Sequence, residues 1–175
     1  IIDHQDIYTN TKGLGACLTD LGQTYTDLTD GLLAGGAVDL TGFNTFIIGS
    51  HAAANTVIQS ALKTAEAVMW SFVEQGGTII MLTQADQNRA DETWMERPAQ
   101  AHRCDLDFGT VYRIRTAHSL FNRPNTINDA DLSGWSYNSW PGSWESFDLF
   151  RGMGVLAGNH ATAPTYGTIL EAGWG

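Results

Sequence analysis

The sequence is poor in positive charge and has no long apolar run. Nine Lys and Arg residues stand against nineteen Asp and Glu, which gives a formal net charge of −10 at pH 7. A negative charge of this size opposes binding to nucleic acid or to an anionic membrane surface. No apolar run approaches the roughly 20 residues that a bilayer span needs, and no signal peptide is visible. We therefore predict a soluble protein without a nucleic-acid or membrane partner.

Cysteine is scarce as well, because Cys17 and Cys104 are the only two in the chain. Two cysteines at this separation do not form a metal-ligand pattern, and they assign no cellular compartment. The sequence also lacks a His-x-His or His-Glu-x-x-His element, which are the common histidine spacings of zinc sites. We therefore predict no metal and no cofactor.

The clearest pattern in the chain is one β-α-β unit. A short apolar run, Phe43 to Gly49, precedes a long amphipathic segment and a second apolar run, Thr78 to Leu82. Because the second run is continuously apolar rather than alternating, it predicts a parallel strand that is covered on both faces.

The segment between the two runs predicts a helix with defined ends. Asn55 is the expected N-cap, and Gly76 is expected to take the left-handed conformation that ends a helix. Apolar residues repeat at steps of four and three and form one stripe, which predicts the buried face of the helix. The stripe consists of Ile58, Leu62, Ala65, Met69 and Phe72.

The rest of the chain gives weaker patterns. At 175 residues and 43% hydrophobic residues, the length suits one domain with one core. Apolar periodicity is lost after Asp86 and returns near Gly154, which predicts an aromatic-rich insertion at about 87–150. The other expected elements are strands at Ile1–Ile2, Gln23–Leu28, Thr110–Ile114, Gly154–Ala157 and Gly167–Glu171, and a helix at Gly13–Leu21.

Three segments resemble the class I glutamine amidotransferase-like superfamily, in its divergent branch of trehalose-utilisation-type and sugar-enzyme-associated proteins. They are the strand Phe43–Ser50, the helix end Trp70–Thr78 with its Phe-Val-x-x-Gly-Gly-Thr sequence, and the late segment Leu170–Gly175. The resemblance implies a three-layer α/β/α fold with a mostly parallel, flavodoxin-like sheet. The family pattern continues past Gly175, so we expect the sequence to be truncated at one or both ends.

The chain departs from that family at the catalytic nucleophile. In the amidotransferases a cysteine follows the strand that corresponds to Thr78–Leu82, but here that place reads Thr83-Gln84-Ala85-Asp86. Cys17 falls in a predicted helix and Cys104 in the insertion, where no strand-to-helix elbow presents them. We therefore predict that the protein has no amidotransferase activity, and we favour a non-catalytic role over an enzyme.

Polar residues follow several of the predicted strands. Ligands of open parallel sheets bind beyond the carboxyl ends of the strands, so these residues are the expected ligand site. The alternative is that they cap helices and fill ordinary polar loops. The candidates are Asp3, His4, Ser50, His51, Gln84, Asp86 and His160.

The predicted insertion is rich in tryptophan. Trp135 and Trp140 lie in a segment with many Asn, Ser and Gly residues, and flat aromatic faces beside polar groups suit sugar rings. The same tryptophans could instead build a core for the insertion or a subunit interface.

These observations lead to three functional hypotheses. The first is a non-catalytic or degenerate amidotransferase-like domain that binds a small polar ligand, such as a carbohydrate, at the strand carboxyl ends. The second is a hydrolase that acts on a sugar or a sugar derivative, in which Asp86 and either His51 or His160 transfer protons. The third is a structural module that mediates homo-oligomerisation within a larger sugar-active protein.

Overall fold

The chain forms two compact units in the computed structural model, which describes residues 1–5, 10, 12–50, 52, 55–82, 100–134, 136–137, 140–141 and 144–173. The first unit consists of Ile1–Asn88 with Trp174–Gly175, and the second of Arg89–Gly173. Each unit is described by itself below. The expectation of one domain with an insertion at about 87–150 stays a prediction.

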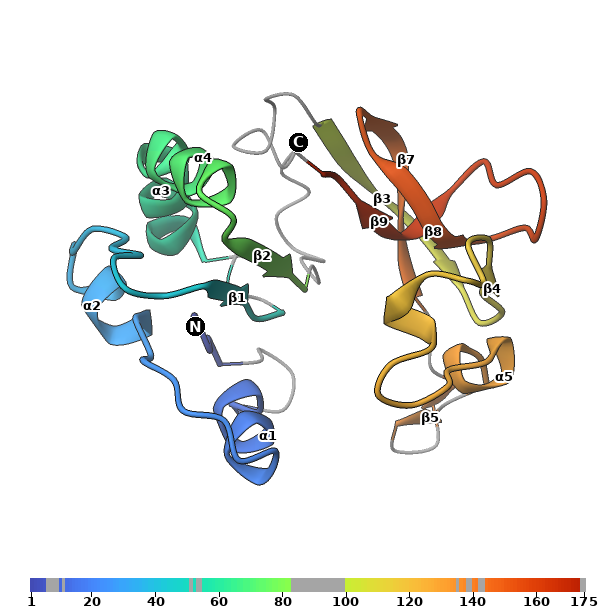
Figure 1. Cartoon of the computed structure of the whole chain (residues 1–175), viewed down its shortest axis with the longest axis horizontal. Coiled ribbons are helices and arrows are strands. Elements are labelled where there is room, and N and C mark those ends of the chain that lie inside the picture. Colours follow the sequence, from blue (N-terminus) through green and yellow to red (C-terminus); the bar gives the residue numbers. More distant parts are fainter. Residues whose placement is uncertain are drawn as a thin grey trace. The chain divides into compact units, whose positions relative to one another are not determined.

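Unit 1 is built around a small parallel sheet (Figure 1). Strand β1 (Thr45–Ile48) pairs in parallel with β2 (Thr78–Met81), and Ile2 adds a parallel bridge to Ile48 on the other side of β1. The helices of this unit are α1 (Leu14–Asp20), α2 (Thr29–Leu33), α3 (Thr56–Thr64) and α4 (Glu66–Glu74). The predicted β-α-β unit is therefore confirmed, as is the helix expected at Gly13–Leu21.

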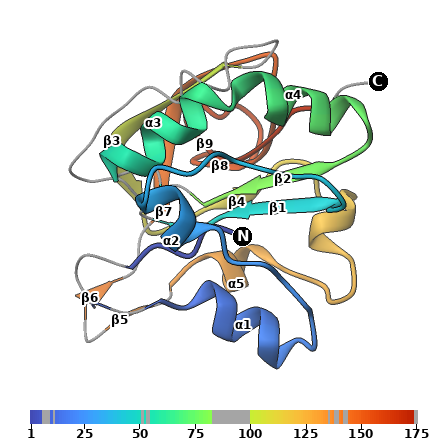
Figure 2. The same cartoon turned by 90° about the vertical axis from the view of Figure 1, so that its left-hand side faces the viewer.

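Helices α3 and α4 follow one another along the β1–β2 pair (Figure 2). The Asn55 side chain caps α3 by accepting hydrogen bonds from the backbone N–H groups of Val57 and Ile58. The helical path breaks for one residue at Ala65, so the predicted single helix is two short ones. All five residues of the predicted stripe are buried. The hydrophobic periodicity thus predicted the buried face correctly, although it did not predict the break.

The two glycines after α4 have different structural reasons. Gly76 has a φ of +93°, the left-handed conformation predicted for the end of the helix. Gly77 is needed for space, because a Cβ at this position would lie 2.5 Å from Cε1 of Phe72. The Phe72 ring therefore packs directly on the Gly77 backbone, which connects α4 to the first residue of β2.

Among the described residues of unit 1, only one face of the β1–β2 pair is well covered. Phe46 and Ile48 are buried, and they share a face with Ile79 and Met81 of β2 through the parallel register. On the other face Ile80 is 43% exposed. The expectation that the second apolar run is a strand covered on both faces is therefore wrong.

Unit 2 is an antiparallel sheet with short helices. Its strand order is β3-β7-β9-β8-β4, and every neighbouring pair is antiparallel. A further two-stranded sheet pairs β5 with β6. The strands are β3 (Gln100–Phe108), β4 (Tyr112–Arg113), β5 (Ser136–Tyr137), β6 (Trp140–Pro141), β7 (Trp144–Arg151), β8 (Gly154–Gly158) and β9 (Gly167–Glu171), and the helices are η2 (Ser119–Phe121) and α5 (Asp129–Leu132).

The core of unit 2 forms where the short helices meet the sheet. Val111, Phe121, Leu132, Leu156 and Ala157 are buried together there. Phe108, Ile127, Trp144 and Ile169 pack against this cluster, and the indole Nε1 of Trp144 donates a hydrogen bond to the carbonyl of Leu132 at 2.6 Å. Trp144 is thus a core residue, which agrees with the structural alternative for the tryptophans of this segment.

The predicted three-layer, mostly parallel, flavodoxin-like fold is wrong. Strands were expected at Gly154–Ala157 and Gly167–Glu171, and both form, but they pair with each other and with β4 and β7 in an antiparallel sheet. The physical reason is the length of their connection. Only residues 159–166 join β8 to β9, whereas a parallel crossover needs a dozen or more residues and usually a helix.

The strand expected at Gln23–Leu28 does not form either. This segment instead bonds to the first residue of the chain, because the Thr26 carbonyl accepts from the Ile1 amino group and Leu28 N–H donates to the Ile1 carbonyl. Within the described residues, no helix has the length and apolar character needed to cross a membrane.

Candidate functional site

The candidate site lies at the carboxyl end of the parallel strands of unit 1. Ile2 N–H donates to the Ile47 carbonyl at 2.9 Å, and Gly49 N–H donates to the Ile2 carbonyl at 2.8 Å. A Cβ on Gly49 would lie 2.8 Å from the Ile2 carbonyl oxygen, so glycine allows the two segments to approach this closely. Asp3 and His4 follow one segment and Ser50 follows the other. The structure therefore brings these three predicted residues to one edge of the sheet, which we call the rim.

Asp3 serves the fold of unit 1. It is 7% exposed, and its Oδ2 accepts a hydrogen bond from Gly15 N–H at 2.8 Å while Oδ1 accepts one from Leu14 N–H at 3.3 Å. These N–H groups belong to the first turn of α1, where a negative charge is stabilised by the helix dipole. Both carboxylate oxygens of Asp3 are therefore engaged, which matches the helix-capping alternative rather than ligand binding.

Two successive hydrogen bonds, through Thr29 to Asp27, hold the backbone of Asp3 in place. Asp3 N–H donates to Oγ1 of the buried Thr29 at 2.8 Å, and that hydroxyl donates to Oδ1 of Asp27 at 2.5 Å. Burial raises the pKa of the Asp27 carboxyl, but hydrogen bonds from Thr29 and the charge of Lys12 outweigh burial, so the pKa lies below its usual range. The rim thus begins on a rigidly held backbone.

His4 is linked to the N-cap of α3. Nδ2 of Asn55 lies 3.2 Å from Nε2 of His4. The Oδ1 atom of Asn55 accepts hydrogen bonds from Val57 and Ile58 N–H, so the other end of the amide, which faces His4, must be its NH₂ group. An NH₂ group only donates, so Nε2 of His4 accepts. The proton of the neutral imidazole is therefore on Nδ1.

The Nδ1 atom of His4 has no hydrogen-bond partner among the described residues, although it is buried. Buried polar atoms in native proteins are nearly always paired, and an unpaired donor costs about 1–3 kcal/mol. His4 as a whole residue is only half-buried. The rim therefore contains a donor, Nδ1–H, that lacks an acceptor.

Ser50 completes the described part of the rim. It is half-buried in the turn after β1, and its carbonyl accepts a hydrogen bond from Ala52 N–H at 2.6 Å. Its hydroxyl makes no hydrogen bond to the described part of the chain, so it can serve as a second polar group beside His4.

Several predicted site residues lie outside the described residues. These are His51, Gln84, Asp86 and Trp135, and the side chain of Trp140 also lies outside the described part. Their assignment to a ligand site stays a prediction.

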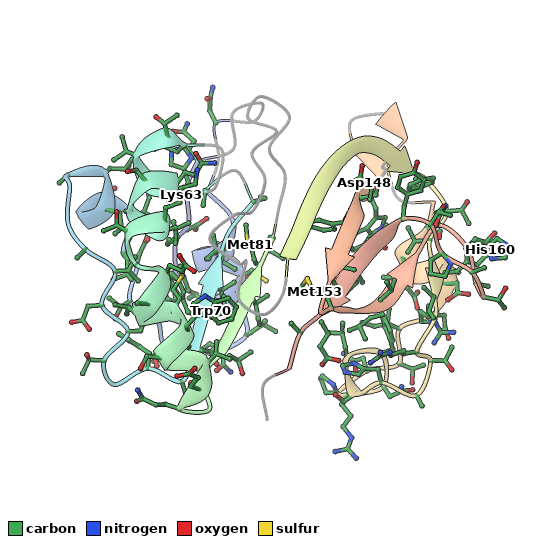
Figure 3. All side chains as sticks on the ribbon, turned by 90° about the horizontal axis from the view of Figure 1, so that it is seen from above. Lys63, Trp70, Met81, Asp148, Met153 and His160 are labelled. Carbon is green, nitrogen blue, oxygen red and sulfur yellow. The ribbon has the colours of Figure 1, made fainter. Side chains whose placement is uncertain are left out.

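His160 belongs to unit 2, in the loop between β8 and β9 (Figure 3). Its Nδ1 accepts hydrogen bonds from the backbone N–H groups of Thr162 at 3.3 Å and Ala163 at 3.2 Å. Asn159 closes the same loop, because its Oδ1 accepts from Thr165 and Tyr166 N–H. The imidazole of His160 thus shapes its own loop.

A groove of about 580 Å³ lies elsewhere in unit 1, between the segment after α2 and helices α3 and α4. Its lining is uncharged and includes Val38, Val57, Ala61 and Val68. Ligand sites usually combine apolar walls with a few converging polar groups, which often include residues of perturbed pKa. We place the candidate site at the rim because the unpaired Nδ1–H lies there, not in this groove.

No group of three or more His, Cys, Asp or Glu residues in the described part of the chain is placed to hold a metal ion. Asn55 was predicted from the sequence as a helix cap, whereas its contact with His4 was not predicted. An asparagine N-cap directly after a rim loop was the available signal, since its NH₂ group remains free to bond elsewhere. Because His4 and Asn55 are 51 residues apart in the sequence, no local pattern predicts their contact.

Comparisons with protein-family models, with curated proteins and with solved structures find no match to this chain.

Proposed function

We propose that unit 1 is a non-catalytic module that binds a small polar ligand, of which carbohydrates are the class to test first. The observation that carries the proposal is the buried Nδ1–H of His4, which has no acceptor among the described residues and lies at the carboxyl end of parallel strands. A ligand oxygen would complete this hydrogen bond. Ser50 would add a hydroxyl from the neighbouring loop.

Binding is favoured over proton-transfer catalysis by the state of the rim side chains. A general base needs a free lone pair within reach of the substrate. The Nε2 lone pair of His4 accepts from Asn55, and the carboxylate of Asp3 is buried with each oxygen already accepting a hydrogen bond from α1. The hydrolase hypothesis assigned proton transfer to Asp86 with His51 or His160, and it stays an alternative.

The resemblance to the class I glutamine amidotransferase-like superfamily also stays a prediction. The β1-α3-α4-β2 crossover of unit 1 supports it, because two of the three similar segments lie there. The antiparallel sheet of unit 2 does not agree with the fold that the resemblance implies.

The binding proposal is tested by titrating the isotope-labelled chain with a panel of mono- and disaccharides and following its amide signals. We expect saturable shifts at His4, Ser50 and Asn55 and none at His160, which serves as an internal reference in unit 2. Absence of saturable shifts at the rim with every sugar would contradict the proposal.

A structural role in assembly is the second candidate, and one observation favours it. Ile80 of β2 is 43% exposed and Leu82, directly after β2, is 46% exposed, and among the described residues β2 pairs on one side only. Exposed apolar residues on an edge strand favour pairing with another chain. Sedimentation of the wild type and of Ile80→Lys tests this role. A dimer that the substitution dissociates would support assembly, whereas a monomer at high protein concentration would contradict it.

A further inference from the structure

We infer that the ligand of the rim is uncharged and hydroxylated, as neutral sugars are, and that the site discriminates against sugar acids and sugar phosphates. This inference rests on the proposed function. Two independent observations carry it: the donor character of His4 Nδ1, and the distribution of charge in unit 1.

The first observation concerns the hydrogen bond that the ligand must complete. The amide of Asn55 fixes the His4 proton on Nδ1, so the ligand has to present an acceptor. A hydroxyl, carbonyl, carboxylate or phosphate oxygen meets this requirement, whereas an amine that is protonated at neutral pH does not. The Nδ1 atom is also inaccessible to water, so a ligand oxygen must displace the atoms that now cover Nδ1.

The second observation excludes the charged acceptors. The sequence of unit 1 contains nine acidic residues and two basic ones, Lys12 and Lys63. Nζ of Lys12 lies 4.0 Å from Oδ2 of Asp27 and 3.9 Å from Oδ1 of Asp30, so the positive charge of Lys12 is already paired with these carboxylates. Lys63 lies in the last turn of α3, about 12 Å along the helix from Asn55. The described rim therefore offers an anion no lysine or arginine side chain.

The helix ends at the rim do not replace the missing positive charge. The N-terminus of α1 is already occupied by the carboxylate of Asp3, and the first N–H groups of α3 are bonded to the amide oxygen of Asn55. An anionic ligand would therefore lie near the negative charge of Asp3, with no positive charge in the described rim to offset the repulsion. For charges several ångströms apart in a partly exposed site, this repulsion weakens binding by about tenfold.

Matched ligands test the charge discrimination. Glucose, galactose and mannose are each compared with their uronic acid and their 6-phosphate by amide-shift titration at low and high salt. We expect the neutral sugar to bind at least about tenfold more tightly than its charged derivatives at low salt, with a smaller ratio at high salt. Equal or tighter binding of the acids at the rim would overturn the inference and leave the proposed binding function intact. Binding of none of them would overturn the proposed function itself.

Matched substitutions test the role of Nδ1. The amide of asparagine occupies roughly the place of imidazole Nδ1, and the amide of glutamine roughly that of Nε2. His4→Asn therefore keeps a donor for the ligand, while His4→Gln keeps only the contact with Asn55. We expect His4→Asn to retain neutral-sugar binding within a few-fold and His4→Gln to weaken it by about tenfold or more. The reverse order, or no effect of either change, would overturn the assignment.

A third variant keeps the test decisive if the His4 variants do not fold. Asn55→Ser retains an N-cap oxygen for α3 but removes the NH₂ group that fixes His4. We expect a folded protein in which both imidazole tautomers of His4 are populated and neutral-sugar binding is weakened by a few-fold. Unchanged sugar affinity in this variant, with the His4 proton redistributed, would show that Nδ1–H does not contact the ligand.

Discussion

The Oδ2 atom of Asp3 lies 2.8 Å from the backbone nitrogen of Gly15, the buried residue in the first turn of α1, and accepts its hydrogen bond. In Asp3→Asn, an NH₂ group replaces one of the two carboxylate oxygens that accept hydrogen bonds from Leu14 and Gly15 N–H. We expect the free energy of unfolding to fall by about 1–3 kcal/mol, because a buried donor loses its acceptor. Urea unfolding measures the change. Asp20→Asn, at the exposed end of the same helix, is the control and is expected to change stability by less than about 0.5 kcal/mol.

The three histidines whose side chains the structure describes are expected to hold their protons on different nitrogens. His4 should carry its proton on Nδ1, because Asn55 donates to Nε2. His118 and His160 should carry theirs on Nε2, because backbone N–H groups donate to their Nδ1 atoms. Long-range proton–nitrogen NMR spectra, recorded at a pH where all three are neutral, distinguish the two forms. A proton on Nε2 of His4 would contradict the geometry of the rim.

Gly77 is expected to tolerate no side chain. A Cβ at this position would lie within 2.6 Å of three atoms of the Phe72 ring, which cannot bend away as a flexible chain would. We expect Gly77→Ala to reduce the free energy of unfolding by about 1–3 kcal/mol through overpacking. Phe72→Ala alone should cost about 3–5 kcal/mol.

The double variant Phe72→Ala/Gly77→Ala separates packing from backbone effects. Because removal of the ring opens the space that the new methyl group needs, the two losses should not add. Fully additive losses in urea unfolding would mean that the ring is not the obstacle.

The ion pair of Arg113 and Asp129 makes the stability of unit 2 depend on pH. Nε of Arg113 lies 2.7 Å from Oδ1 of Asp129, and the hydrogen bonds from Arg113 hold the pKa of that carboxyl below its usual value of 3.8. A lowered folded-state pKa adds stability above the unfolded pKa, and this stability is lost as the pH falls through the folded one. Because the Asp129 side chain is 44% exposed, the contribution is under about 1 kcal/mol.

Asp129→Asn tests this dependence. At pH 7 we expect the variant to be less stable than the wild type, and we expect the difference to disappear as the pH falls below 3.8. Urea unfolding at a series of pH values, followed on amide signals of β8, measures the difference. A difference that stays constant down to pH 2 would contradict the charge-based account.

Local features of the fold could be predicted from the sequence, whereas pairing across long separations could not. Asn55, the apolar stripe and Gly76 act within a few residues, so their patterns predicted the cap, the buried face and the end of the helical region. The strands at Gly154–Ala157 and Gly167–Glu171 were found, but an apolar run does not say which strand lies beside it. Their short connection was the signal that favoured an antiparallel pair, and the resemblance to a parallel family outweighed it.

The site was predicted in part for the same reason. Strand ends indicated that Asp3, His4 and Ser50 share one edge. The sequence could not distinguish a carboxylate that caps a helix from one that binds a ligand, because that depends on which N–H groups lie within reach of Asp3. The contact between His4 and Asn55 is set by tertiary structure alone.

We propose that a neutral ligand oxygen completes the hydrogen bond of His4 Nδ1. The most direct measurement is a crystal structure of the whole chain soaked with neutral mono- and disaccharides. We expect an ordered sugar oxygen at about 2.7–3.2 Å from Nδ1 of His4, with the Asn55 contact to Nε2 retained. A rim that stays closed over Nδ1 at saturating sugar, or a sugar bound only elsewhere on the chain, would contradict this proposal.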